Sequence, residues 1–117
     1  MAKRRLLDPR PIYYVYVLMD WLGNPFYVGK GKGNRALQPE RRTDPRNRLK
    51  NEIIEQTWTM LGEIPKIILN QREDRTGLTN KEALELEILL IKLIGRIDIG
   101  SGPLVNMTDG GEGGNGY

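Results

Sequence analysis

The sequence predicts a small α+β domain, with a central antiparallel sheet of about three strands that opens with an N-terminal hairpin and is flanked by helices. Three observations predict this class. Residues 12–19 and 26–29 are two β-branched and aromatic runs separated by a turn. Two longer segments, 45–61 and 80–95, carry apolar residues at helical spacing. Strands and helices do not alternate strictly, which favours an antiparallel sheet over repeated strand–helix–strand units.

The hairpin comes first in the chain. Its first strand is IYYVYVLM at 12–19, and the strand pattern resumes with FYVG at 26–29. Between them DWLGNP, residues 20–25, contains the Gly, Asn and Pro that turns favour. We therefore expect two antiparallel strands joined by a loop of about six residues.

The first helix is expected at about residues 45–61. Asp44 is a suitable N-cap, and Pro45 suits the first helical position. The apolar positions that follow at helical spacing are Leu49, Ile53, Ile54, Trp58 and Leu61. A short third strand is expected at 64–69, where the sequence reads IPKIIL.

The second helix has clearer boundaries. Thr79, with Glu82 three residues later, forms a capping box at its start. Gly95 follows the last apolar residue of the pattern and is expected to end the helix.

Composition narrows the chemistry. The 117 residues suffice for one modest core, so we expect a single domain, 1–117, with a basic arm at 1–10 and a glycine-rich segment at 103–117. The absence of cysteine excludes disulfides and thiolate metal sites, and it fits a reducing cytoplasm. The absence of histidine excludes a Ser-His-Asp triad, an imidazole zinc site and a histidine base. No apolar run is long enough to cross a bilayer, and we expect no secretory signal and no membrane partner.

Charge is unevenly spread along the chain. Residues 1–50 contain 12 Lys and Arg against 4 Asp and Glu, a net charge of +8. Residues 51–117 contain 6 against 11, a net charge of −5. Such asymmetry is typical of a polyanion-binding face, and a solvated basic surface explains it equally well.

The sequence FYVGKGKGNR runs from a strand into an expected glycine- and lysine-rich loop. Residues 29–36 lack the spacing and the terminal hydroxyl of a phosphate-binding P-loop. GKGNRA matches the dinucleotide-binding fingerprint, but it follows a hairpin and Pro39 interrupts the chain, so we reject that interpretation too. Two interpretations stay open. The loop is either an exposed turn with solvated charges or a place where glycines let a phosphate backbone approach Lys30, Lys32 and Arg35.

Helical periodicity places Glu87 on the apolar side of the second helix. Lys81, Glu85 and Lys92 fall within about 40° of one another and define the solvent side. Glu87 falls nearly opposite, beside Ile91. A buried carboxylate is costly unless it is paired, hydrogen-bonded or bound to a metal. An ion pair with Lys or Arg therefore competes with metal or catalytic use as the explanation.

Three tyrosines occupy the hairpin. Tyr14 and Tyr16 share a strand face because strand side chains alternate, and Tyr27 on the adjoining strand is expected near them. Taken alone, packing on a half-buried strand is the simpler explanation of these rings.

Together these segments resemble the GIY-YIG nucleases, a family of metal-dependent enzymes that cut DNA phosphodiester bonds. The family's Gly-Ile-Tyr motif matches residues 14–16, with Tyr14 replacing the glycine, and its Tyr-Ile-Gly motif matches residues 27–29. A lysine follows, as in many members, and here it is Lys30. The resemblance covers about residues 12–113.

The family's later elements also have counterparts. Its arginine matches Arg35, although two residues fewer than in many members separate Tyr27 from this arginine. Arg41 and Arg42 are the alternatives for this position. Its metal-binding glutamate, in a leucine-rich helix, matches Glu87. Its late asparagine matches Asn106, although the segment between these two residues is longer than in the repair enzymes of the family.

The resemblance implies a mechanism. Glu87 holds one divalent ion, Mg²⁺ with Mn²⁺ as the alternative, Tyr16 orients or deprotonates the attacking water, and Arg35 donates to the phosphate. The catalytic residues that it implies are Tyr16, Tyr27, Lys30, Arg35, Glu87 and Asn106. We expect the acid, two phenols and the guanidinium to meet in one DNA-accessible hollow.

DNA is the expected partner. The residues expected to contact it are Tyr14, Lys30, Lys32, Arg35, Arg41, Arg42, Arg46 and Arg48. One active site cuts one strand, so cutting both strands requires a homodimer or two events. The alternatives are a non-catalytic nucleic-acid-binding module that uses the sheet aromatics and basic residues, and a nucleotide-binding enzyme that uses residues 29–36.

Overall fold

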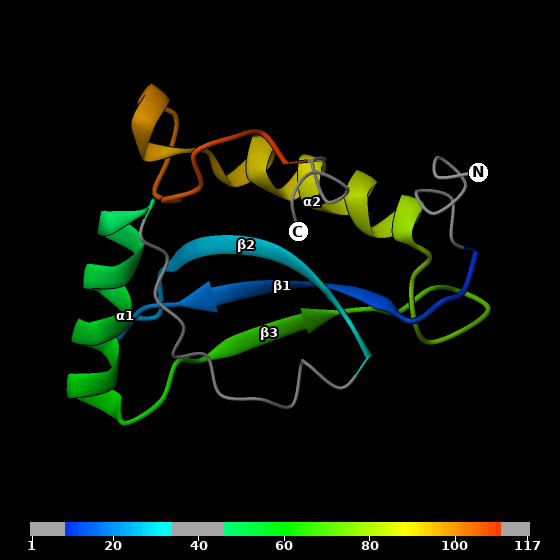
Figure 1. Cartoon of the computed structure of the whole chain (residues 1–117), viewed down its shortest axis with the longest axis horizontal. Helices are drawn as coiled ribbons and strands as arrows, with labels where there is room; N and C mark the ends of the chain where they lie inside the picture. The colour runs from blue at the N-terminus through cyan, green and yellow to red at the C-terminus, as the bar shows by residue number, and fades with distance from the viewer. Residues whose placement is uncertain (1–8, 34–45, 111–117) are drawn as a thin grey trace.

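The computed structural model describes residues 9–33 and 46–110. In chain order the elements are β1 (Tyr13–Met19), β2 (Pro25–Lys32), α1 (Arg48–Leu61), β3 (Lys66–Leu69), α2 (Asn80–Ile94) and the 3-10 helix η3 (Ile97–Ile99). The strands form one antiparallel sheet in the order β2-β1-β3 (Figure 1). The predicted α+β class, three-stranded antiparallel sheet and N-terminal hairpin are confirmed.

The hairpin turn contains five residues, 20–24, rather than the predicted six. The Asp20 carboxylate accepts hydrogen bonds from the backbone N–H groups of Leu22 and Asn24, both at 2.9 Å. Gly23 adopts φ +84°, a conformation that other residues avoid. These local bonds let the chain reverse early, so β2 begins at Pro25.

β2 is longer than predicted, and this corrects the expected loop at 29–36. Residues 29–32 pair with β1 as regular strand, ending with Lys32 opposite Tyr13. The chain leaves the strand at Gly33, which has φ +63°. The first two glycines of the GKGKG sequence are therefore strand residues.

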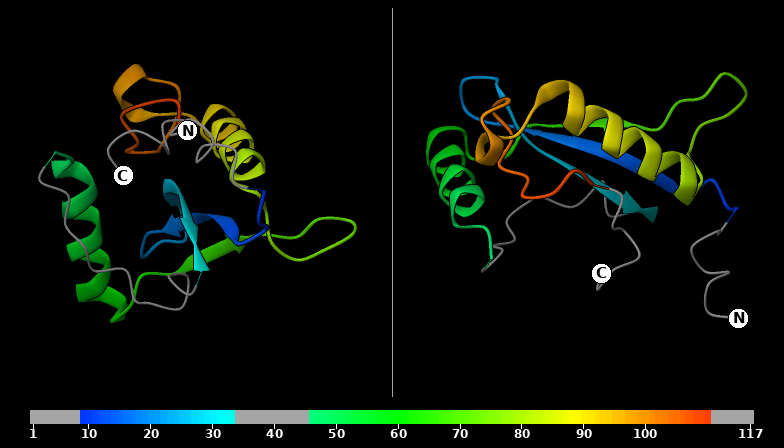
Figure 2. Two further views of the ribbon diagram at one scale, coloured as in Figure 1. Left: turned by 45° about the vertical axis from the view of Figure 1, so that its right-hand side comes forward. Right: turned by 90° about the horizontal axis from the view of Figure 1, so that it is seen from above.

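The sheet is covered on both faces. Tyr13, Val15 and Val17 point to one face and pack with residues of α2. Tyr16 and Leu18 point to the other face and pack in a cluster that includes residues of α1. Figures 1 and 2 show α2 running along the strands while α1 crosses the hairpin end of the sheet. Burial on both faces explains why the β1 sequence is apolar without alternation.

α1 begins later than predicted, at Arg48, with Asn47 as its N-cap. The predicted cap, Asp44, and Pro45 lie outside the described residues. Asn47 suits the position because its side-chain oxygen accepts from the N–H of Lys50 at 3.1 Å while its amide reaches the carbonyl of Val105 at 2.8 Å. Asp could supply only the first of these bonds.

The buried stripe of α1 is rotated from the predicted one. Lys50, Ile54 and Thr57 are buried, whereas Leu49 and Leu61 are 40% and 47% exposed. α1 crosses the hairpin end of the sheet (Figure 1), and Leu49 and Leu61, near its two ends, are not covered by this contact.

α2 has the predicted boundaries. Thr79 accepts from the N–H of Glu82 at 3.2 Å, and the Glu82 carboxylate accepts from the N–H of Thr79 at 2.9 Å, so the capping box is confirmed. Gly95 ends the helix at φ +94°. No helix within residues 9–33 and 46–110 is long and apolar enough to cross a membrane.

Candidate active site

Two tyrosine rings of β1 lie across the edge strand β2. A Cβ atom on Gly29 would be 2.4 Å from the Tyr16 hydroxyl oxygen, and one on Gly31 would be 2.5 Å from that of Tyr14. Both glycines are therefore required by the rings that cover them. We expected them to let DNA approach a loop, and the structure gives them this different role in the hairpin. Since β2 is an outer strand, both hydroxyls reach the edge of the sheet.

The three predicted tyrosines are neighbours, as expected. The centroids of the Tyr14 and Tyr16 rings are 6.3 Å apart, and those of Tyr16 and Tyr27 are 6.4 Å apart. Two lysines that sequence reasoning missed lie over these rings. Lys50 Nζ is 3.8 Å from the Tyr27 centroid, and Lys66 Nζ is 5.6 Å from that of Tyr16. This face of the sheet therefore combines phenols with cations.

Glu87 points inward from α2, as its periodicity predicted. It is half-buried, beside Ile91 and the backbone of Gly110. A Cβ atom on Gly110 would be 3.2 Å from Glu87 Oε1 and 3.0 Å from Ile91 Cδ1. The solvent side is also as predicted, since Lys81, Glu85 and Lys92 are exposed.

Lys30 lies on the α2 side of β2, near Glu87. It is half-buried and donates to the side-chain oxygen of Asn80, and its Nζ lies 5.2 Å from the centroid of the Tyr13 ring. Burial lowers the pKa of Lys30, the negative charge of Glu87 opposes this, and the positive charge of Lys32 adds to it. A half-buried carboxylate and a half-buried ammonium thus interact at this side of the strand.

Among the described residues, no three His, Cys, Asp or Glu side chains gather into a group that could hold a metal. A carboxylate such as Glu87 is a suitable ligand for Mg²⁺, which keeps several waters and commonly uses one or two carboxylates with phosphate oxygens.

Asn106 is buried and holds the C-terminal segment to the open edge of β2. Its Oδ1 accepts from the N–H of Val28 at 3.0 Å, and its Nδ2 donates to the carbonyl of Val28 at 2.8 Å. The next bond along this edge runs from the N–H of Val105 to the carbonyl of Phe26 at 2.8 Å. The side chain thus takes the place of a neighbouring strand.

The predicted catalytic residues do not share one face of the sheet. Glu87 and Lys30 lie on the α2 side, whereas Tyr16 and Tyr27 lie on the α1 side. The strand β2 separates the two groups, so a site that uses both would lie at its edge, where the Tyr16 hydroxyl reaches Gly29. Arg35 lies outside the described residues, and so do its alternatives Arg41 and Arg42.

Of the predicted DNA contacts that the structure describes, Lys32, Arg46 and Arg48 are exposed and Lys30 is half-buried. Tyr14 is only 4% exposed because its ring packs over Gly31, so the expectation that it contacts DNA is wrong. Lys32 ends β2, and Arg46 and Arg48 lie at the start of α1. Arg48 forms an ion pair with Glu52 at 3.4 Å, but its side chain is 93% exposed.

Sequence reasoning missed several contributors besides the two lysines over the rings. Tyr13 and Asn80 contact Lys30, and strand alternation could have placed Tyr13 on that face once the hairpin register was known. Arg96, which binds the C-terminal segment, was missed because its partners in that segment, Asp109 and the carbonyl of Met107, lie 13 and 11 residues along the chain.

Searches against models of protein families, against curated proteins and against solved structures gave no significant match. The resemblance to GIY-YIG nucleases, which depends on short motifs in a fixed order, therefore stays a prediction.

Proposed function

We propose that this chain is a metal-dependent endonuclease that hydrolyses DNA phosphodiester bonds at the edge of β2. The observation that carries the proposal is the position of Glu87. This carboxylate is half-buried beside Lys30, the residue that directly follows the Tyr27–Gly29 motif. The Tyr16 ring extends across the same strand from the other face.

Different residues of the chain bind the phosphate, orient the attacking water and position the strand. Lys30 supplies a positive charge whose burial strengthens its attraction for a phosphate. Tyr16, with its hydroxyl over Gly29, orients the attacking water, and Tyr27 lies beside it to bind the water or the phosphate. Asn106 fixes the backbone of β2 at Val28, next to the motif glycine.

Two parts of the proposed mechanism, the metal ion and the phosphate-binding arginine, depend on the resemblance to the GIY-YIG motifs. Glu87 would hold one Mg²⁺ or Mn²⁺ ion, which when bound supplies polarisation of the phosphate and stabilisation of the leaving oxygen. Arg35 would donate to the phosphate, since its planar guanidinium suits two phosphate oxygens. DNA as the partner and a reducing cytoplasm as the location fit this chemistry, and cutting both strands would require a second copy or a second event.

A second candidate, binding of nucleic acid without cleavage, is favoured by the tyrosines and lysines on the α1 side. Tyr16 and Tyr27 are half-buried, with the ammonium groups of Lys66 and Lys50 over their rings, so phenol hydroxyls and positive charges lie together on this side, which suits contact with a phosphate backbone. This candidate gives Glu87 no role.

Substitution of Glu87 by Gln separates the two candidates. We expect wild-type protein to nick plasmid DNA with Mg²⁺ or Mn²⁺ and not with EDTA. Glu87→Gln should reduce the cleavage rate by at least about 100-fold, because a neutral amide holds a divalent ion poorly, and DNA affinity should change little. Glu85→Gln is the matched control, since it removes the same charge from the exposed side of the same helix, and it should cleave normally.

A wild-type protein that binds duplex, branched and single-stranded DNA but cleaves none of them with any divalent metal would favour the binding module. Equal cleavage by Glu87→Gln and Glu85→Gln would overturn the assignment of the metal ligand.

A further inference from the structure

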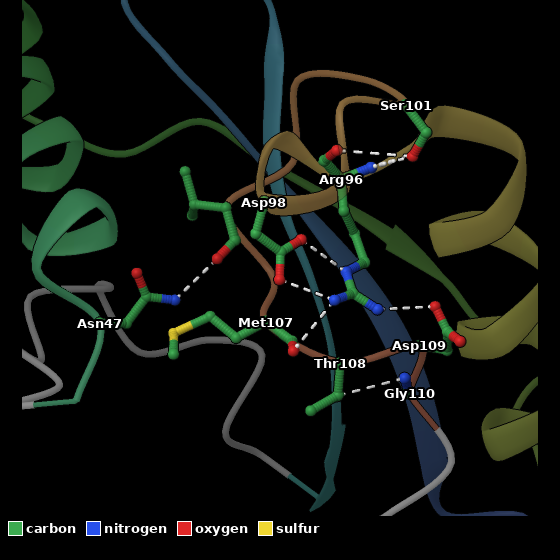
Figure 3. Close-up of polar contacts among 9 residues, drawn as sticks. Asn47, Arg96, Asp98, Ser101, Met107, Thr108, Asp109 and Gly110 are labelled. Carbon is green, nitrogen blue, oxygen red and sulfur yellow. Dashed lines mark hydrogen bonds and ion pairs between the residues drawn. The ribbon is translucent and has the colours of Figure 1, made fainter.

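Arg96 follows Gly95, the residue that ends α2, and connects the helix to the C-terminal segment (Figure 3). Its side chain is 12% exposed, and its guanidinium donates to both carboxylate oxygens of Asp98, at 2.9 and 2.7 Å. It also donates to Asp109 at 2.7 Å and to the carbonyl of Met107 at 3.2 Å. Hydrogen bonds with Asp98, and then with Asp109, raise the pKa of Arg96, and the guanidinium lowers the pKa of Asp98. The guanidinium thus cross-links the end of α2 to residues 107–109.

The backbone around Arg96 is also fixed by hydrogen bonds to residues that follow it in the chain. Its N–H donates to the Ser101 hydroxyl at 2.9 Å, and its carbonyl accepts from the N–H of Ser101 at 3.0 Å. The N–H of Leu104, which is fully buried, donates to the carbonyl of Gly95 at 2.9 Å. The base from which the guanidinium extends is therefore held at several points.

The segment that Arg96 binds lies between two contacts with the candidate site. On one side, the Asn106 side chain pairs with both backbone groups of Val28 on β2. On the other side, the backbone of Gly110 lies against the carboxylate of Glu87. Only three residues separate Asn106 from Gly110, so a cross-link within them restrains both ends.

We propose that Arg96 is a positioning residue, which holds Asn106 against β2 and Gly110 against Glu87 by fixing residues 107–109. The proposal rests on the nuclease function proposed above. Arginine suits this position because the nitrogens of its planar fork donate four hydrogen bonds to three separate acceptor groups, whereas lysine has only three donors, all on one nitrogen. Groups that orient the ligands of a site typically contribute about 10- to 100-fold in activity or metal affinity.

The test compares Arg96→Ala and Arg96→Lys with Arg75→Ala. Arg75 is a matched control because it lies just before the other end of α2 and also pairs with two carboxylates, those of Asp74 and Glu82. At a temperature where all variants are folded, both Arg96 variants should lower kcat for cleavage by about 10- to 100-fold with little change in KM for DNA. Arg75→Ala should lose stability but keep kcat.

A second readout is independent of cleavage. The N–H of Val28 donates to Asn106, so its hydrogen exchange in metal-free, DNA-free protein reports whether the segment is held. We expect faster exchange at Val28 in both Arg96 variants and unchanged exchange in Arg75→Ala. Asp109→Asn, which weakens one bond of the cross-link, should give a smaller acceleration and serves if Arg96→Ala does not fold.

Unchanged Val28 exchange in the Arg96 variants would overturn the positioning role, whatever the protein cleaves. Accelerated exchange with full kcat would overturn it as well, because the segment would then be irrelevant to the reaction. A wild-type protein without cleavage would instead remove the proposed function, while Val28 exchange would still decide whether Arg96 holds the segment.

Discussion

Gly29 and Gly31 lie within β2, at positions where a strand ordinarily carries a side chain. Glycine there weakens a strand because it has no side chain to pack. In this hairpin the rings of Tyr16 and Tyr14 fill the space that the missing side chains leave. The glycine of the Tyr27–Gly29 motif is thus explained by the tyrosine opposite it, so the two motifs form one packing unit.

Substitution of Gly29 by Ala tests this unit. The new methyl group would lie 2.4 Å from the Tyr16 ring, so the ring must move. We expect a loss of about 1–3 kcal/mol in the free energy of unfolding, which is typical of overpacking, together with slower cleavage. Urea denaturation measures the stability loss.

The double variant Gly29→Ala/Tyr16→Ala is the control for that experiment. The three atoms nearest to the new methyl group all belong to the Tyr16 side chain, so the cost of Gly29→Ala should largely disappear in this background. Equal costs in the presence and in the absence of Tyr16 would show that the glycine serves another purpose.

At the scale of elements, the ends of α2 were predictable and those of α1 were not. The capping box of Thr79 and Glu82 is a local pattern, and so is the helix-ending Gly95. Asn47 instead became the cap of α1 partly through a bond to Val105, a residue far along the chain. By local sequence Asp44 is as suitable an N-cap as Asn47. Only a tertiary contact, such as the bond from Asn47 to Val105, distinguishes the two residues.

The start of α2 gives a pH-dependent prediction. The backbone N–H of Thr79, and then the guanidinium of Arg75, lower the pKa of Glu82 from 4.5 to about 2. Because this folded-state pKa lies below the ordinary value, the stabilisation is complete above about pH 4.5 and is lost as the pH falls toward 2. We expect Glu82→Gln to lower the urea midpoint at neutral pH, and the difference from wild type to shrink across that window.

Urea denaturation at several pH values checks this prediction. Glu85→Gln controls for the loss of one negative charge from the same helix, since Glu85 is exposed and lies outside the capping box. A difference between Glu82→Gln and wild type that stays constant from neutral pH to pH values near 2 would contradict the assignment.

At the scale of the whole molecule, periodicity predicted which way a side chain points but not which element covers it. Alternation placed Tyr14 and Tyr16 on one strand face, and helical spacing pointed Glu87 inward, and both are confirmed. Neither rule says that α2 covers the opposite face of the sheet from the tyrosines. Whether Glu87 and the tyrosines share one hollow therefore depends on which face of the sheet each helix covers, and the sequence patterns do not contain this information.

The uneven charge of the chain gives the last prediction, on DNA binding. Lys32 and Arg48 are exposed in the basic half of the sequence, and Arg48 is 93% exposed despite its ion pair with Glu52, which at such exposure contributes little. If each contacts one phosphate, Lys32→Gln and Arg48→Gln should each reduce the slope of log affinity against log salt concentration by about 0.9 for duplex DNA. Fluorescence anisotropy over a range of NaCl concentrations, in EDTA to prevent cleavage, measures these slopes.

Lys92→Gln is the control for this experiment. It removes an exposed charge of the same sign from the outer side of α2 and should leave the slope unchanged. Equal reductions in all three variants would mean that overall charge, rather than a basic DNA-facing surface, determines binding.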